Sequence, residues 1–319
     1  MSDQLPAGPT PRDSQGEACE IVRCVLTDVP VRVVAAVTTG VAREAAARHG
    51  AGAAGAVALG RALTAGLLLA TLTKDDERVT LQVLGDGPLG GITVDASGAG
   101  TARAYVKHPG AGRIAAGGTR PSLGAAVGRS GLVSVIRDVG LREDFSGATE
   151  IRSGEIDDDV ERYLTESEQI ESALACEASV GADGRVAAAA GILVQALPGS
   201  AGASDVAAAR RLFAEGALAR VVEIGRVVSG ADLVAAVFGG RLGEVRVLDR
   251  RAVRFFCPCS RERADASLAM LGSTDLSEMI LDDGRAEVTC NFCRARYDFD
   301  DKDLERIRRR AAGADGPPS

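Results

Sequence analysis

Four of the seven cysteines in this chain stand in two close pairs near its C-terminal end. One proline separates Cys257 from Cys259, and Cys290 and Cys293 follow after 30 intervening residues. Each pair can sit on one local turn, and folding can then aim all four thiolates at a single ion. Four thiolates close the coordination shell of a tetrahedral zinc and leave no position for a catalytic water. The spacing therefore predicts one Zn²⁺ per chain in a site that is not hydrolytic.

The other three cysteines are expected to be buried and inert. Cys19, Cys24 and Cys176 stand in strand-like surroundings, where a free thiol acts as a small apolar side chain. The first 16 residues lack the basic and apolar regions of a signal peptide, which predicts a cytoplasmic protein. In a reducing compartment, cysteines serve as metal ligands or redox groups more often than as a disulfide framework.

Enzyme chemistry has little support in the sequence. The chain has only two histidines: His49 closes an Ala-rich stretch and His108 precedes a proline, so both are expected to be structural or surface residues. Nucleophile-elbow, zinc-protease and P-loop motifs are all missing from the sequence. The run from Gly85 to Gly90 matches G-x-G-x-x-G, but Pro88 and the strand-like residues after it predict a hairpin turn instead of a nucleotide-binding helix. We therefore expect a protein that is not an enzyme.

Composition also argues against nucleic-acid and membrane partners. The formal net charge is −7 and aromatic residues make up 3% of the chain, so neither a basic surface nor a stacking platform is expected. The most apolar stretch, 51–72, carries Arg61 near its middle, which favours a buried core helix over a membrane span. An arginine run, Arg306 and Arg308 to Arg310, is expected to cap the negative end of a helix over 303–310.

The elements before residue 200 predict an α+β domain with strands and one helix that is apolar on most faces. We expect strand structure over 21–37, interrupted at Pro30, and further strands at 79–84, 92–95, 101–106 and 132–137. Helices are expected at 41–49, 53–72 and 157–168, and the Gly181–Gly184 turn predicts a hairpin of 174–180 with 185–197.

Residues 200–251 are expected to form a helical linker of low intrinsic stability. Val206, Phe213 and Val221 recur at helical spacing behind a predicted N-cap at Ser204. Glycines recur through this stretch, and each one inside a helix costs about 1 kcal/mol relative to alanine. The expected division is a disordered lead-in at 1–16, an N-terminal domain at 17–199, the metastable linker at 200–251, a zinc module at 252–310 and a disordered tail at 311–319.

These motifs together resemble the thirty-three-kilodalton redox-regulated heat-shock chaperone (chaperonin) family. The resemblance rests on Phe256 to Ser260, on Cys290 to Cys293 with Tyr297 and Phe299, and on Val79 to Leu89. It extends to Ser167–Gln169 and Gly191–Gln195 and covers about residues 19–310.

The resemblance implies a three-layer β/α/β domain with a buried helix, and a holdase that is inactive while reduced and zinc-bound. Oxidation would then form disulfides, release zinc, unfold the linker and expose Val206, Phe213 and Val221 to unfolded client proteins. The oxidised form is expected to be a homodimer. The competing hypothesis is a zinc-ribbon nucleic-acid-binding regulator whose zinc is static.

Four cysteines permit three disulfide pairings. The resemblance leads us to expect Cys257–Cys259 and Cys290–Cys293, the pairs that close the smallest loops, although Pro258 makes the first bridge tight.

Overall fold

The computed structural model describes residues 19–27, 29–74, 77–115, 120–138, 140, 145–223, 229–239 and 243–314. Contacts divide the chain into two compact units, Met1–Phe256 and Cys257–Ser319. Residues 200–251, which we expected as a separate linker, group with the first unit. The expected lead-in at 1–16 and the last five residues of the expected tail lie outside the described residues. Residues 311–314 of that tail belong to a helix.

The first unit contains a five-stranded and a six-stranded sheet, both largely antiparallel. The smaller sheet has the order β10-β1-β2-β9-β8, with β1 (Glu20–Leu26), β2 (Val31–Val37), β8 (Ser172–Val180), β9 (Val186–Ala196) and β10 (Val245–Ala252). The larger sheet has the order β11-β5-β4-β3-β6-β7, with β3 (Arg78–Gly85), β4 (Ile92–Ser97), β5 (Thr101–Val106), β6 (Gly131–Asp138), β7 (Phe145–Glu150) and β11 (Arg254–Phe255).

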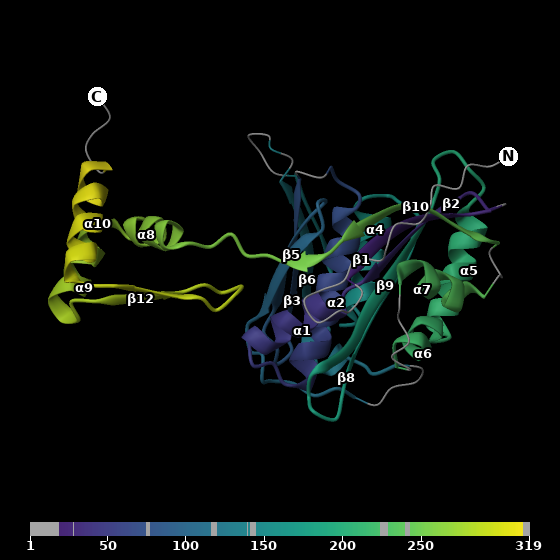
Figure 1. Ribbon diagram of the computed structural model, residues 1–319, viewed down its shortest axis with the longest axis horizontal. Coiled ribbons are helices and arrows are strands. Elements are labelled where there is room, and N and C mark those ends of the chain that lie inside the picture. Colours follow the sequence, from purple (N-terminus) through teal and green to yellow (C-terminus); the bar gives the residue numbers. More distant parts are fainter. Residues whose placement is uncertain are drawn as a thin grey trace. The chain divides into compact units, whose positions relative to one another are not determined.

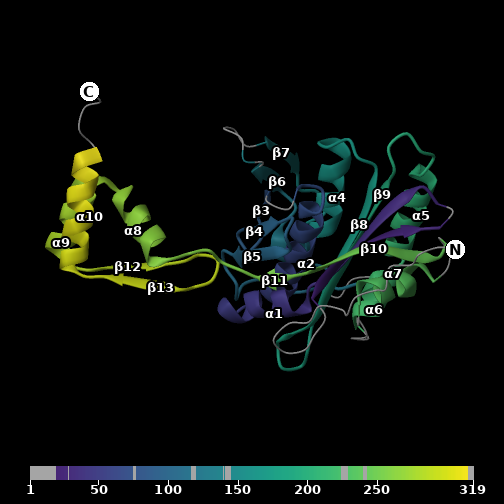
Figure 2. The ribbon, with the colours of Figure 1, turned by 45° about the horizontal axis from the view of Figure 1, so that its top comes forward.

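Helices fill the space between the sheets and also cover the outer face of the smaller one. The inner layer holds α1 (Thr39–Arg48) and α2 (Ala53–Ala70), with α4 (Ile156–Glu166) packed into the same core and the short α3 (Gly124–Val127) nearby. Figures 1 and 2 show α1 and α2 between the sheets and α5 (Ala203–Ala214), α6 (Ala217–Glu223) and α7 (Gly230–Phe238) on the far side of the five-stranded sheet. The expected three-layer β/α/β fold is confirmed, and α5–α7 add a further layer.

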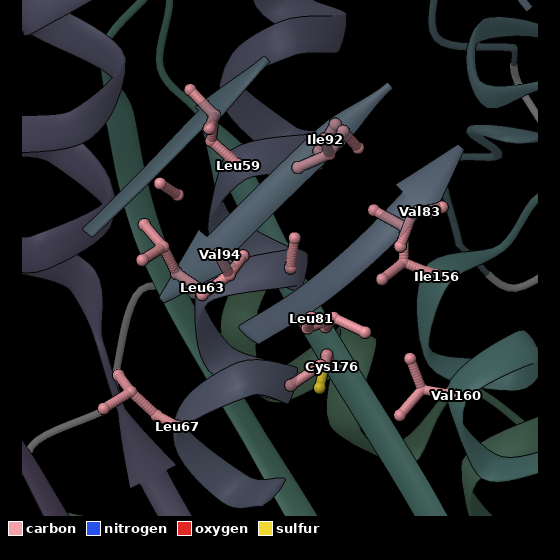
Figure 3. Packing of buried hydrophobic residues seen from close by; sticks show 14 of the residues in the cluster. Leu59, Leu63, Leu67, Leu81, Val83, Ile92, Val94, Ile156, Val160 and Cys176 are labelled. Carbon is pink, nitrogen blue, oxygen red and sulfur yellow. The ribbon is translucent and has the colours of Figure 1, made fainter. Parts of the chain in front are cut away.

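The central helix α2 packs closely against both sheets. By length and composition it could cross a membrane, yet 94% of it is buried inside the fold, as expected for a core helix. A Cβ at Gly60 would lie 2.6 Å from Ala178 on β8, and one at Gly66 would lie 2.7 Å from Val94 on β4. Glycine at these two positions lets the helix approach each sheet. Figure 3 shows Leu59, Leu63 and Leu67 of this helix in the core they share with β3 and β4.

Most predicted elements of the first unit are present. Helix α3 and strand β11 were not predicted, and three further differences concern β10, β7 and α5. Residues 245–252 form strand β10 where we expected linker helix, because β1 offers an edge with which they pair. Strand β7 was not predicted. Ser204 lies inside α5, and Gly202 occupies the N-cap position. Gly85–Gly90 lies at the turn between antiparallel β3 and β4, so the prediction of a hairpin is confirmed.

Arg61 of α2 is a fully buried charge that ties three distant segments together. Its guanidinium lies 2.7 Å from Glu155 and 2.7 Å from Glu177, and it donates to the carbonyl of Pro121 at 2.8 Å. Both carboxylates are also mostly buried, at 13% and 5% exposure, and each is compensated by Arg61 together with Arg120, which lies 3.9 Å from Glu155 and 3.2 Å from Glu177.

Replacing Arg61 by Ala is expected to lower the free energy of unfolding by about 3–5 kcal/mol, because two buried carboxylates each lose the closer of the cations that pair with them. Urea unfolding followed by circular dichroism measures the change. Lys74→Ala is the matched control: it removes an ion pair whose lysine is 84% exposed, and it should cost less than about 1 kcal/mol. Similar small losses in both variants would contradict this account of the core.

Candidate functional site

The second unit is a small module built around a hairpin and three helices. It comprises α8 (Arg261–Ala269), α9 (Gly272–Asp282), β12 (Ala286–Thr289), β13 (Arg296–Phe299) and α10 (Asp301–Ala314). Its buried apolar side chains are few and several are small: Ala264, Leu268, Leu276, Phe299, Leu304, Ile307 and Ala311. A core of this size supplies little stability by itself, so a further cross-link would contribute strongly.

Two local turns bring the four C-terminal cysteines together. Cys257 and Cys259 immediately precede α8, whose first turn is capped by the Ser260 hydroxyl, which accepts from the Arg263 amide. Cys290 and Cys293 lie in the loop that joins β12 to β13. That loop is closed by the Cys290 amide, which donates to the Ala295 carbonyl at 2.9 Å.

All four sulfur atoms lie within 4.8 Å of one another. The Cys257 and Cys290 sulfurs are 3.7 Å apart, and the Cys259 and Cys293 sulfurs are 3.1 Å apart. In a tetrahedral site with zinc–sulfur bonds of about 2.3 Å, neighbouring sulfurs stand about 3.8 Å apart. The cluster could therefore hold a metal ion, and its compactness favours none of the three disulfide pairings over the others.

The protonation preference of the cluster also fits a cation site. Desolvation raises the pKa of Cys290 and raises the pKa of Cys293 to about 12, so without a cation these groups stay neutral thiols at neutral pH. A coordinated cation reverses this preference, because it stabilises the thiolate directly. A soft, all-sulfur donor set selects zinc over hard oxygen-seeking cations such as Mg²⁺ and Ca²⁺.

The remaining cysteines are buried in the first unit, as expected. Cys19, Cys24 and Cys176 are at most 2% exposed. Burial raises the pKa of Cys24 to about 11, and burial with the nearby Asp157 and Glu177 carboxylates raises that of Cys176 well above its usual range. A buried, protonated thiol is a poor nucleophile, so oxidants should meet the C-terminal cluster first.

Helices α5, α6 and α7 cover an apolar face of the five-stranded sheet. Under them lie side chains of all five strands, including Val22, Val33 and Ile192. Val206 is fully buried in this interface, whereas Phe213 and Val221 are partly buried against it. The rings of Phe213 and Phe238 stand 6.0 Å apart in a tilted arrangement. The three predicted linker residues thus all contribute to one apolar layer.

Polar anchors hold this layer to the sheet. Arg210 of α5 pairs with Glu161 at 2.6 Å and donates to the Ser172 carbonyl at 2.7 Å. The buried Glu20 carboxylate accepts from the Gly230 amide at 2.8 Å and from Arg250 at 3.0 Å, which links α7 to β1 and β10. These anchors were not found from the sequence because their partners lie far apart along the chain.

A pocket of about 750 Å³ lies beside α6. It is lined by Ala219 and Val222 of this helix and by Val57 of α2, with Ala178 and Val180 among its other walls. Three of the seven residues of α6 are buried, whereas 17 of the 18 residues of α2 are buried. Helix α6 therefore gains less from burial than α2 does.

The C-terminal arginine run does not cap its helix, which corrects our expectation. Helix α10 extends to Ala314, so the run lies inside it. Its arginines pair with carboxylates: Arg306 with Asp265 and Asp303, Arg308 and Arg309 with Glu305, and Arg310 with Asp265. Each arginine of the run thus has a carboxylate partner.

A hydrogen bond between Tyr297 and the cluster was not predicted from the sequence. The Tyr297 hydroxyl donates to the Cys259 sulfur at 3.2 Å. This hydrogen bond, followed by burial, raises the pKa of Tyr297 to about 12, so the phenol stays protonated at neutral pH. The tyrosine lies opposite Val288 in the β12–β13 pairing.

Comparison with known proteins identifies the family of this fold and cluster. A family model described as Hsp33 protein matches residues 20–300. The 33 kDa chaperonin of Bacillus subtilis is 35% identical over 288 residues, covering 90% of this chain and 97% of the relative. That of Gloeobacter violaceus is 40% identical over 294 residues, covering 91% and 95%.

A solved structure agrees with this match. The crystal structure of the 33 kDa chaperonin of Thermotoga maritima superimposes with a TM-score of 0.81 at 28% identity, covering 92% of this chain and 99% of that one. The sequence matches extend across both units, including the four-cysteine cluster. This chain is therefore a member of the Hsp33 family.

Proposed function

We propose that this protein is a chaperone holdase, not an enzyme, which is inactive while its cluster is reduced and becomes active when the cluster is oxidised. The observation that carries the proposal is the four-cysteine cluster in a module with a small apolar core. Membership of a family whose relatives are named 33 kDa chaperonins supports the chaperone activity. The covered apolar face beneath α5–α7 supports a concealed binding surface.

In the reduced state, Cys257, Cys259, Cys290 and Cys293 hold one Zn²⁺ per chain. A structural zinc bound by four thiolates contributes on the order of 10–16 kcal/mol to the folding of a small domain. The zinc and its cysteine ligands thus supply the cross-link that stabilises a module with a small apolar core. A reducing compartment keeps them in this state, which is why we place the protein in the cytoplasm.

Oxidation by a peroxide removes the charge that holds the ion. One thiolate attacks the peroxide: a sulfur–oxygen bond forms, the oxygen–oxygen bond breaks and hydroxide leaves. A second thiolate then attacks that sulfur, a disulfide forms and hydroxide leaves again, so two electrons pass to the peroxide and two protons complete two waters. We propose the pairs Cys257–Cys259 and Cys290–Cys293. A disulfide carries no negative charge, so the cysteines release zinc and the module unfolds.

Unfolding of the module destabilises the linker because the two are joined through β11 and β10. Cys257 directly follows Phe256, whose amide donates to the Ala102 carbonyl beside β11, and β11 follows β10. Loss of the module leaves β11, which follows β10, without a folded segment after it. Residues 200–251 then detach, and Val206, Phe213 and Val221 with the sheet face become available to unfolded clients or, in a homodimer, to a second copy. Nucleic acid and membranes are not partners in this proposal.

Zinc binding has a direct test. Reduced wild-type protein should contain one zinc per chain, and Cys290→Ser should lower its zinc affinity sharply, because three thiolates leave the shell open. Elemental analysis and competition with a chelator measure both. Cys24→Ala, which removes a buried thiol of the first unit, should leave zinc content unchanged. Full occupancy in a protein lacking both Cys290 and Cys293 would disprove the assignment.

The proposed dependence of the linker on the module predicts a protease pattern. Deleting residues 257–319 should raise tryptic cleavage at Arg211 and Arg220, in α5 and α6, even under reducing conditions. Cleavage at Arg61, buried in α2, serves as the internal control and should stay slow. Equal protection of α5 and α6 with and without the module would show that the module does not stabilise them.

The chaperone switch is tested by aggregation. Protein treated with peroxide and mild heat should suppress light scattering from a heat-denatured client, whereas reduced, zinc-loaded protein at equal concentration should not. Strong reductant with zinc should restore the inactive form. If both forms protect equally, or if neither does although zinc has been released, a static zinc module becomes the better account.

A further inference from the structure

The hydrogen-bond donors around the four sulfurs are of two kinds. Backbone amides serve Cys290, from Phe292 and Cys293, and serve Cys293, from Ala295. Cys259 instead accepts from a side chain, the Tyr297 hydroxyl on β13. The backbone donors are fixed by the fold of the loop. The tyrosine donor is a single side-chain hydroxyl, which a substitution can remove.

A hydrogen bond to a thiolate changes what the sulfur can do. It draws electron density away from the sulfur lone pairs, which lowers nucleophilicity toward an oxidant or an alkylating agent. It also disperses part of the negative charge that four thiolates place around one cation, which supports metal binding. Both effects are strongest on the sulfur that accepts the bond.

The ring of Tyr297 has a second contact that fixes the hydroxyl in place. The residue pairs with Val288 across the hairpin, and its ring packs against the apolar core of the module. A phenylalanine would keep this packing and lose only the donor.

We propose that Tyr297 is a positioning residue that shields Cys259 and thereby slows the oxidation that opens the cluster. The inference rests on the proposed redox function and specifies how the rate of that oxidation is set. Attack on peroxide, with sulfur–oxygen bond formation and loss of hydroxide, then begins at a sulfur other than Cys259, and Cys259 enters in the disulfide-forming step.

The test is site-resolved alkylation of the reduced, zinc-loaded protein. N-ethylmaleimide is added for increasing times, and mass spectrometry follows each of the four cysteines. Tyr297→Phe should raise the alkylation rate of Cys259 on the order of tenfold relative to wild type, with smaller changes at the other three. Zinc release by peroxide should accelerate in parallel. Tyr163→Phe, which removes a hydroxyl bonded to Glu168 in the first unit, is the control and should change neither rate.

Two outcomes overturn the proposal. Unchanged alkylation of Cys259 shows that the hydrogen bond does not govern its reactivity, and an equal rise at all four cysteines shows that Tyr297 only supports the fold of the module. If Tyr297→Phe does not bind zinc, 3-fluorotyrosine replaces tyrosine throughout the chain. Its phenol is a stronger donor, so Cys259 should react more slowly than in wild type, and an unchanged or faster rate counts against the proposal.

The alkylation experiment uses neither a client nor an oxidant. A protein with selective protection of Cys259 but no oxidation-dependent holdase activity would retain this inference and lose the proposed function. A working redox switch with no selective protection would do the reverse.

Discussion

The five-stranded sheet is apolar on both faces, and both faces must be kept from water. Helix α2 covers the inner face permanently, because the six-stranded sheet encloses it from the other side. Within the part of the chain that the structure describes, the outer face is covered by α5, α6 and α7, each of which also carries exposed residues. On the inner face, α2 belongs to the core between the two sheets. On the outer face, α5–α7 are the helices that the proposed mechanism releases.

The two covers differ in how they are held. Helix α2 is 94% buried and is fixed by the ion pairs of Arg61 with Glu155 and Glu177. Helices α5–α7 are held by apolar contacts with the sheet and by polar anchors such as Arg210 with Glu161, and only three of the seven residues of α6 are buried. In the proposed mechanism, the outer cover has the low local stability that conformational switches require. In the proposed mechanism the cysteine cluster supplies the missing stability from outside the sheet, through the continuity of β10 and β11 with Cys257.

Local patterns made much of this molecule predictable from its sequence. The apolar run of α2 and the Gly181–Gly184 turn each depend on a short segment, and so does each of the two cysteine pairs. Two of the failures came from partners that are distant in the chain. Residues 245–252 are a strand because β1 lies beside them, and the carboxylates that neutralise Arg61 stand 94 and 116 residues away. The ion pairs of Arg308 and Arg309 with Glu305 are local and could have been read from their i,i+3 and i,i+4 spacing.

Native-state hydrogen exchange tests the central claim, that the outer cover is released while the core remains. Amides of α2, β3, α5, α6 and α7 are compared in reduced, zinc-loaded protein and in protein treated with peroxide and mild heat. The account predicts that amides over 203–238 lose protection on oxidation while those of Ala53–Ala70 and Arg78–Gly85 keep theirs. Unchanged protection over 203–238, or loss of protection throughout the first unit, would contradict it.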